Sequence, residues 1–390
     1  MTQENNPIPG NIRFISIAPG RVNLLGGHVD YNDGAVLPVA IDLTVKIVGS
    51  PREDDYLCLQ TSAFEETVVI DLKHLEEKVD FKGNPLPGWA MYPASIAWAM
   101  QEEGHTIKGT EAVFTSNVPI GSGLSSSAAV EVAFAALWRE MHGLALDNMT
   151  LSRLCQKAEN EYVGVNCGLM DQFASAHGIE GHALHFDTRS LDWYAVPLSN
   201  EIGLIVADSG VRHSLAGSAY NDRRDECEQA VIILKEHLPD IKALRDVSVN
   251  QFEEFKNFLP EIIQRRARHI ISECARVELA VDLLKEGDIK GFGEIMFQAH
   301  ASLRDDYEVS CPELDTLIEI ASELPGCYGA RLTGGGFGGS TINVVDLDQI
   351  EPFKEALHSA YKSKYDHPSR VIQCLPGRGV WVQNSNSIKP

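Results

Sequence analysis

The chain has 390 residues with 55 acidic and 33 basic side chains, so its formal net charge is −22. Non-specific binding to nucleic acid needs a basic surface, so this composition argues against a nucleic-acid partner. Hydrophobic residues make up 44%, enough to build sizeable cores, and no apolar run approaches the length of a membrane span. Eight cysteines without CxxC spacing and a polar N-terminus predict a cytoplasmic protein. We expect a monomer.

Apolar alternation and β-branched runs predict strands, whereas apolar positions at helical spacing predict helices. In the first half of the chain they predict strands over 12–17, 36–48, 56–60 and 67–71, a helix over 89–102, a strand over 111–116, and helices over 125–142 and 152–163. In the second half they predict strands over 184–187 and 202–208, helices over 221–237, 252–267 and 275–286, and strands over 329–332 and 340–345. We expect Pro19-Gly20 to end the first strand. The order is α+β rather than a regular βαβ alternation, with domains expected over 1–200 and 201–390.

The segment 119–129 joins a glycine turn to three serines and then enters an Ala-rich apolar run. Its glycines let the backbone approach a ligand, and the following helix offers free N–H groups and the positive end of its dipole. Phosphate is the ligand that such a place favours, and a serine hydroxyl there can reach a metal ion. The loop lacks the Gly-Lys-Ser/Thr ending of a Walker A motif. A plain serine helix cap is the alternative.

A second polar cluster, 19–34, places Arg21, His28, Asp30 and Asn32 among glycines within one loop. Carboxylates and imidazole accept hydrogen bonds from sugar hydroxyls, and arginine supplies a fixed positive fork. The cluster therefore favours a polyhydroxylated ligand. A long turn with Asx caps is the structural alternative.

A third cluster, 159–173, contains Asp171 next to apolar residues. A partly buried carboxylate needs a cationic partner, for which Arg21 is a candidate. Glu159 on the preceding helix could join a serine hydroxyl as a Mg²⁺ ligand. The alternatives are a capping aspartate and a glutamate on a helix surface. The fourth cluster, five glycines within 334–339, forms either a tight hairpin or part of the phosphate site.

In this order the four clusters resemble the GHMP kinase superfamily and, within it, the galactokinases. The segment 21–31 resembles the galactokinase signature G-R-V-N-L-I-G-E-H-T-D-Y. The segment 121–129 resembles the ATP-phosphate loop, 332–339 the third motif, and 168–172 the stretch that carries the catalytic aspartate. A further similar stretch is 211–215 with Tyr220 and Arg223-Arg224. The resemblance extends from about residue 12 to residue 383.

The resemblance implies a two-domain α+β fold, with a ribosomal-S5-like N-terminal domain and a ferredoxin-like C-terminal domain. It implies ATP, Mg²⁺ and a sugar in the cleft between them. By position the resemblance assigns catalysis to Asp171 and Arg21, and Mg²⁺ binding to Ser127 and Glu159. It assigns sugar binding to Gly27, His28, Val29, Asp30, Gly168 and Tyr220. It assigns ATP binding to Gly121, Ser122, Gly123, Leu124, Ser125, Ser126, Ser127, Trp89 and Tyr92.

The expected reaction is transfer of a phosphoryl group from ATP to the anomeric C1 hydroxyl of galactose. Such a transfer depends on positioning and charge stabilisation more than on covalent chemistry. Asp171 would orient the hydroxyl, and whether it also removes the proton stays open. Arg21 would stabilise the transition state.

Two positions depart from the galactokinase pattern. Gly27 stands where a glutamate is usual, and Val29 stands where a threonine is usual. In relatives that glutamate binds the C6 hydroxyl of the sugar, and loss of such a bond costs about 1.5–3 kcal/mol. This is roughly a 10- to 150-fold loss of affinity. We expect Gly27 to open space, as small residues do in relatives that phosphorylate L-arabinose or galacturonate.

Galactose is nevertheless the first expectation, because 28–33 fits galactokinases best. A kinase for L-arabinose or galacturonate is the alternative. A non-catalytic sugar and ATP sensor is a further one, but the intact loop 125–129 with Arg21 and Asp171 favours catalysis. A mevalonate or homoserine kinase is disfavoured, because those relatives lack the 28–31 segment.

Overall fold

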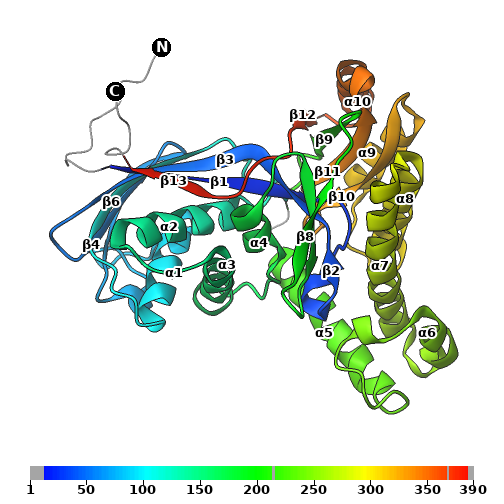
Figure 1. The fold of residues 1–390 in the computed structure, drawn as a ribbon, viewed down its shortest axis with the longest axis horizontal. Helices are drawn as coiled ribbons and strands as arrows, with labels where there is room; N and C mark the ends of the chain where they lie inside the picture. The colour runs from blue at the N-terminus through cyan, green and yellow to red at the C-terminus, as the bar shows by residue number, and fades with distance from the viewer. Residues whose placement is uncertain (1–12, 213–215, 367–368, 385–390) are drawn as a thin grey trace.

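The computed structural model describes residues 13–212, 216–366 and 369–384. Within these ranges the strands form a six-stranded, a four-stranded and a three-stranded sheet. No helix of the described ranges is long and apolar enough to cross a membrane. Figure 1 shows the six-stranded sheet on one side of the molecule and the long helices of the second half on the other.

The six-stranded sheet has the order β13-β1-β3-β6-β4-β5. All neighbours in it are antiparallel except β4 and β6. Helices α1 to α4 lie along one face (Figure 1), and Phe134, Leu137 and Trp138 of α2 are buried in the core beneath it. The bounds are β1 Phe14–Asn23, β3 Pro38–Pro51, β4 Tyr56–Thr61, β5 Phe64–Asp71, β6 Thr110–Ser116, β13 Trp381–Asn384, α1 Gly88–Glu102, α2 Ser126–His142, α3 Asn148–Lys157 and α4 Met170–His177.

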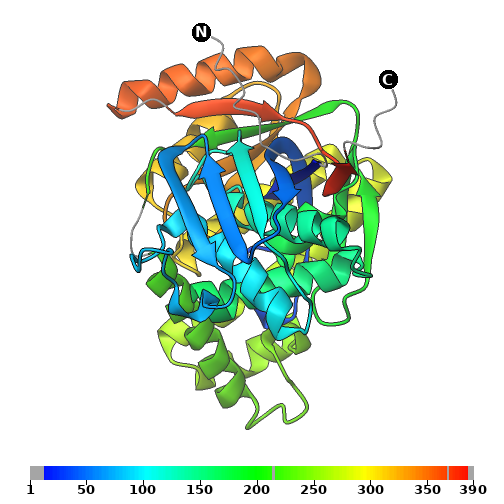
Figure 2. The same ribbon diagram turned by 90° about the vertical axis from the view of Figure 1, so that its left-hand side faces the viewer.

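The four-stranded sheet has the order β10-β11-β9-β12 and is covered on both faces. Successive side chains of a strand point to opposite faces, so Leu204 and Val206 pack with α8 while Ile205 and Ala207 pack with α9 and α10. Figure 2 shows α10 beside β12 at one end of the molecule. The bounds are β9 Ile202–Asp208, β10 Cys327–Thr333, β11 Ser340–Asp346, β12 Arg370–Cys374, α8 Ile289–Asp305, α9 Pro312–Glu323 and α10 Ile350–Lys364.

The small sheet, in the order β2-β7-β8, lies between these two parts (Figure 1). Helices α5, α6 and α7 complete the fold below and beside it. The bounds are β2 Ala35–Val36, β7 His182–Asp187, β8 Trp193–Pro197, α5 Ala216–Leu234, α6 Val249–Phe255 and α7 Glu261–Glu286.

Two expectations about elements are wrong. Pro19-Gly20 does not end β1. The pairing with β3 shifts register between Pro19 and Arg21, and the strand then continues to Asn23. The helices expected over 252–267 and 275–286 are instead a short α6 and one continuous α7, which begins after Pro260. The helix expected over 152–163 is present: α3 runs into a π-helical turn, Ala158–Val163, which ends before Gly164 as expected. Residues 213–215 of the segment 211–215 lie outside the described ranges.

Candidate active site

Asp171 and Arg21 form the centre of the site. Asp171 lies in the first turn of α4, and Arg21 follows the register shift in β1. The guanidinium binds both carboxylate oxygens, with Nε–Oδ1 and Nη2–Oδ2 distances of 2.8 Å. Its Nη1 donates to the carbonyl of Gly123, and the hydroxyl of Ser125 donates to Asp171 at 2.5 Å. The pair is thereby tied to the glycine–serine loop.

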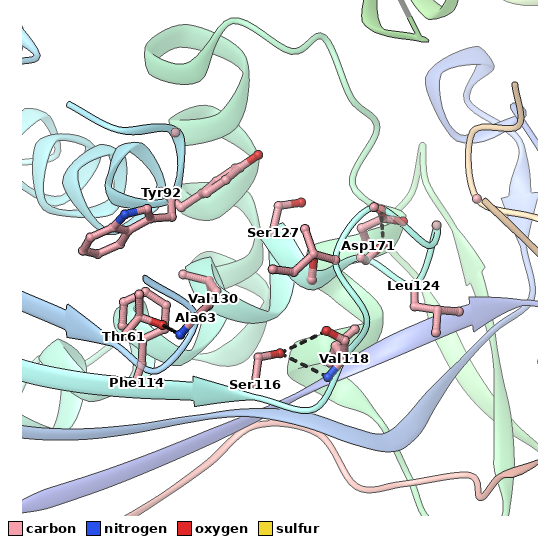
Figure 3. A pocket seen from close by; sticks show the side chains of 18 of the residues that line it. Thr61, Ala63, Tyr92, Phe114, Ser116, Val118, Leu124, Ser127, Val130 and Asp171 are labelled. Atoms are coloured by element: carbon pink, nitrogen blue, oxygen red, sulfur yellow. Dashed lines mark hydrogen bonds between the residues drawn. The ribbon is translucent and has the colours of Figure 1, made fainter. Parts of the chain in front are cut away.

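A cavity of 620 Å³ opens on one side of this pair. Figure 3 shows it extending from Asp171 and Ser127 at one end toward Tyr92 and Phe114 at the other. At the far end the Trp89 ring stacks on Phe64 at 6.1 Å and 10°. An apolar end for an aromatic base and a polar end for phosphates is the arrangement that a nucleotide needs.

Most of the residues predicted for ATP lie on this cavity. Its walls include Gly121, Gly123, Leu124, Ser125, Ser126, Ser127, Trp89 and Tyr92. Ser122 is the exception among the predicted residues, since it is buried and its hydroxyl donates to the carbonyl of Pro119 at 2.7 Å. The assignment of these residues to ATP stays a prediction. Ser122 could act only by holding the loop backbone through its bond to Pro119, without touching ATP itself.

The two glycine loops meet backbone to backbone beside the cavity. A Cβ on Gly123 would lie 2.9 Å from the carbonyl oxygen of Thr333, and one on Gly334 would lie 2.8 Å from that of Gly123. Contacts this close exclude any side chain without a backbone shift. The loop 334–339 therefore packs against the loop that precedes α2, rather than standing apart as an isolated hairpin.

A second cavity, of 240 Å³, lies on the other side of the Arg21–Asp171 pair. The two cavities share Arg21, Asp171, Gly334 and Gly335 as walls. Of the residues predicted for the sugar, this cavity is lined by Gly27, His28, Asp30, Gly168 and Tyr220. Val29 is buried in a hydrophobic cluster and does not line the cavity, so a direct contact with a ligand there is not supported.

Gly168 is required by its neighbour Asp30. A Cβ at position 168 would lie 1.9 Å from the Asp30 Oδ2 atom. Burial raises the pKa of Asp30 to about 6, and the charge of Asp171 acts in the same direction. The cavity thus places Asp30, whose pKa is raised mainly by burial, beside Asp171, which is paired with Arg21.

His28 links the first loop to the last. One ring nitrogen lies 2.8 Å from the Tyr31 hydroxyl, and the other lies 3.2 Å from the carbonyl oxygen of Gly335. Burial lowers the pKa of His28 to about 3, so the ring is neutral. A neutral ring that donates to Gly335 must accept from Tyr31, so both nitrogens are already engaged within the protein.

Glu159 and Ser127 lie together at the edge of the site. Glu159 is in the π-helical turn, a feature that often marks functional positions. Burial raises its pKa to about 7, against hydrogen bonds from Cys167, Gln172 and Ser127 that favour the charged form. Cys167 Sγ and Gln172 Nε2 lie 3.2 Å and 2.7 Å from its Oε2 atom.

These residues fit a magnesium ion carried by a nucleotide. A carboxylate and a hydroxyl are the oxygen ligands that Mg²⁺ prefers, and it usually takes only one or two protein carboxylates together with phosphate oxygens. In the described ranges no group of three or more His, Cys, Asp or Glu side chains could hold a metal by itself. Among the described residues, a buried oxygen of the nearby Glu131 carboxyl has no hydrogen-bond partner.

The expectation that Gly27 opens space is wrong. A Cβ at this position would lie 2.4 Å from Nη2 of Arg331. Arg331 is fully buried and donates to Glu273 at 2.9 Å, and the same Glu273 oxygen accepts from the backbone N–H groups of Gly26 and Gly27. A fixed guanidinium therefore fills the place next to Gly27.

Sequence patterns missed several residues of the site. The tip of the β4–β5 hairpin, Thr61 to Phe64, and Phe114 line the larger cavity, but nothing in their local sequence points to a ligand. Arg331 and Glu273 are separated by 58 residues, and only the fold brings them under the 23–30 loop. An arginine three residues before Gly334, the start of the glycine loop, was the one signal that could have drawn attention to this pair.

The fold and the site define a small-molecule kinase of the GHMP class. Residues 91–179 match the family model for the GHMP kinases N terminal domain, and residues 280–363 match that for the GHMP kinases C terminal domain. Residues 7–51 match the galactokinase galactose-binding signature. The two-domain α+β prediction is confirmed. A mevalonate kinase structure with a TM-score of 0.62 and 19% identity, covering 93% of this chain and 98% of that chain, shares the fold.

Within this class the relatives are galactokinases. The chain is 42% identical to the galactokinase of Roseiflexus sp. over 93% of this chain and 91% of that one, and 41% identical to that of Chloroflexus aggregans over 94% and 92%. The structure of Lactococcus lactis galactokinase complexed with galactose has a TM-score of 0.90 at 32% identity, covering 95% of both chains. The chain belongs to the galactokinase family and is a kinase.

Proposed function

We propose that the chain transfers the γ-phosphoryl group of ATP to the anomeric C1 hydroxyl of galactose, giving galactose 1-phosphate and ADP. The observation that carries this proposal is the Arg21–Asp171 pair in the wall shared by the two cavities. A group at this junction can touch the donor on one side and the acceptor on the other. The curated relatives, which are galactokinases, support galactose as the acceptor.

On the donor side, we assign the base to the end of the larger cavity at Trp89 and Tyr92. The phosphates would lie at the N-terminus of α2, where free N–H groups and the helix dipole favour negative charge. Ser127 and Glu159 would hold Mg²⁺, which when bound neutralises charge on the phosphates. The kinase family to which the chain belongs uses ATP as its phosphoryl donor.

On the acceptor side, Asp171 orients the C1 hydroxyl. Its oxygens already accept hydrogen bonds from Arg21 and Ser125, and this favours a positioning role with proton loss late in the transfer. Arg21 faces the same junction and stabilises the charge that develops on the transferred group. Asp30 and Tyr220 would bind ring hydroxyls, whereas His28 shapes the pocket by joining Tyr31 to Gly335.

The remaining proposals concern the molecule as a whole. We assign domains over 1–200 and 201–390, a cytoplasmic location and a monomeric state. All eight cysteines are free thiols, which supports a reducing compartment.

An ADP-release assay across galactose, L-arabinose, galacturonate and N-acetylgalactosamine tests the function. We expect the highest kcat/KM with galactose. Absence of turnover with all four sugars would contradict the kinase activity, and a higher kcat/KM with L-arabinose or galacturonate would contradict the acceptor. Buffer without sugar gives the background rate of ATP hydrolysis.

A further inference from the structure

Glu131 is a fully buried carboxylate that the proposed reaction does not use. It follows Ser127 by one turn of α2, so the two residues share a helix face. Its Oε2 atom accepts a hydrogen bond from Nε2 of Gln172 at 3.1 Å, and its Oε1 atom has no partner among the residues that the structure describes. Burial of such a group without full hydrogen bonding destabilises a fold.

Gln172 connects this carboxylate to Glu159. The same Nε2 atom donates to Oε2 of Glu159 at 2.7 Å, so one amide bridges two buried carboxyl groups. Gln172 is itself fully buried, and within the described ranges its own Oε1 atom has no partner. Because it directly follows Asp171 in α4, one helical turn places both the catalytic carboxylate and this bridge.

In the part of the chain that the structure describes, the two carboxyl groups at the bridge form no hydrogen bond or ion pair with a cationic side chain. Asp171 is paired with Arg21, but the hydrogen bonds that reach Glu131 and Glu159 come from the neutral side chains of Gln172, Cys167 and Ser127. Burial and the charge of Glu159 raise the pKa of Glu131 well above its ordinary value. A cation at Glu159 would remove part of this cost, so the cluster prefers a bound divalent ion.

We propose that Glu131 and Gln172 are positioning residues for the divalent cation that accompanies ATP. The inference rests on the proposed function for the cation site at Ser127 and Glu159. The Gln172 amide holds Oε2 of Glu159 and so fixes the direction of this carboxylate. A cation at Glu159 favours the ionised form of the buried Glu131 carboxyl, whose charge then adds attraction for the cation. Partners of this kind commonly change metal affinity by about 10- to 100-fold when they are removed.

Binding of Mn²⁺ to the protein saturated with ATP, followed by the EPR signal of free Mn²⁺, tests this inference. The variants are Glu131→Gln, which keeps shape and removes charge, and Gln172→Met, which removes the bridging donor. We expect each to weaken Mn²⁺ binding by about 10-fold. Glu161→Gln is the matched control, because Glu161 is an exposed acid two residues from Glu159, and its Mn²⁺ affinity should equal that of the wild type.

A merely structural role would give a different pattern. Glu131→Gln replaces an incompletely bonded buried carboxyl group with an amide that cannot ionise, so we expect its Tm without metal and nucleotide to equal or exceed that of the wild type while its Mn²⁺ affinity falls. Unchanged Mn²⁺ affinity in Glu131→Gln and Gln172→Met overturns the inference, and if one variant does not fold the other decides. Unchanged affinity in Glu159→Gln overturns it as well.

The same data separate this inference from the proposed function. One possible result is that the wild type fails to phosphorylate galactose while Glu131→Gln binds Mn²⁺ more weakly than the wild type. This result would contradict galactose as the acceptor and support the positioning role. If instead the wild type phosphorylates galactose and both variants bind Mn²⁺ as tightly as the wild type, the proposed function is supported and the positioning role is overturned.

Discussion

Asp30 and Asp171 are two carboxylates in one pocket with different surroundings. Arg21 holds Asp171, whereas burial dominates at Asp30 and raises its pKa to about 6, above the ordinary value of 3.8. A raised pKa means that the folded protein binds this proton more tightly than the unfolded chain does. The stability that Asp30 contributes is therefore present at low pH and is lost as the pH rises from about 4 through 6.

This difference predicts a pH dependence of acceptor binding. The ionised form of Asp30 accepts hydroxyl hydrogen bonds, so we expect the KM for galactose to rise several-fold as the pH falls below about 6. His28, with a pKa of about 3, stays neutral and does not contribute in this range. Steady-state kinetics at saturating ATP and Mg²⁺ measure the profile. Asp30→Asn should have a high KM without the inflection, and an inflection that persists in this variant would assign it to another group.

At Gly27, the small residue suggested free space beside the sugar, but the structure fills that space. Because Arg331 fills the adjacent space, Gly27→Glu should not restore a sugar contact. We expect overpacking to lower the stability of Gly27→Ala and Gly27→Glu by about 1–3 kcal/mol, and the KM for galactose to rise. Thermal unfolding and kinetics measure the two effects. Gly88→Ala is the control for stability, because a Cβ there meets nothing within 4 Å. A lower KM in Gly27→Glu would show that Arg331 moves aside.

At the scale of elements, Ser125 controls how α2 meets the catalytic carboxylate. It precedes the helix with φ +56°, a left-handed conformation that favours glycine, and it donates to Asp171. Both Ser125→Gly and Ser125→Ala lose a hydrogen bond to a charged group, worth about 1.5–3 kcal/mol, so kcat should fall at least about 10-fold in each.

The two variants differ in their backbone. Glycine suits the left-handed conformation and alanine does not, so Ser125→Gly should have the higher Tm of the pair. Stopped assays and thermal unfolding measure these quantities. Equal kcat values in Ser125→Ala and the wild type would show that Ser125 does not orient Asp171.

Elements with a strong local signal were predictable. The glycine–serine loop and α2 follow from turn glycines, serines and a long apolar run, and the structure has this helix over Ser126–His142. Other elements depend on distant partners. Residues 268–274 carry four polar or charged side chains and looked like a break, but His269 and Glu273 are buried under the 23–30 loop and α7 continues through them. Residues 381–384 form strand β13 because they pair with the free edge of β1, which is distant in the sequence.

At the scale of the whole molecule, the site arises where segments from both halves of the chain meet. Arg21, Asp30 and Asp171 come from the first half, and Tyr220 with the 334–337 loop comes from the second. Sequence patterns found most of these segments, because each has its own glycines and polar side chains. They could not find the supporting contacts among Glu131, Gln172, Glu273 and Arg331, because a buried polar residue resembles a surface one in sequence.

In the proposed reaction, the Asp171 carboxylate at the junction of the two cavities directs a phosphoryl group from ATP to C1 of galactose. Phosphorus and carbon NMR of the reaction of ATP with galactose labelled with ¹³C at C1 tests it most directly, with Asp171→Ala as the comparison. We expect the wild type to place phosphate on the labelled carbon's oxygen, and Asp171→Ala to form no product while it still binds ATP by calorimetry. Phosphate on another oxygen, or product formation by Asp171→Ala at the wild-type rate, would contradict the proposed reaction.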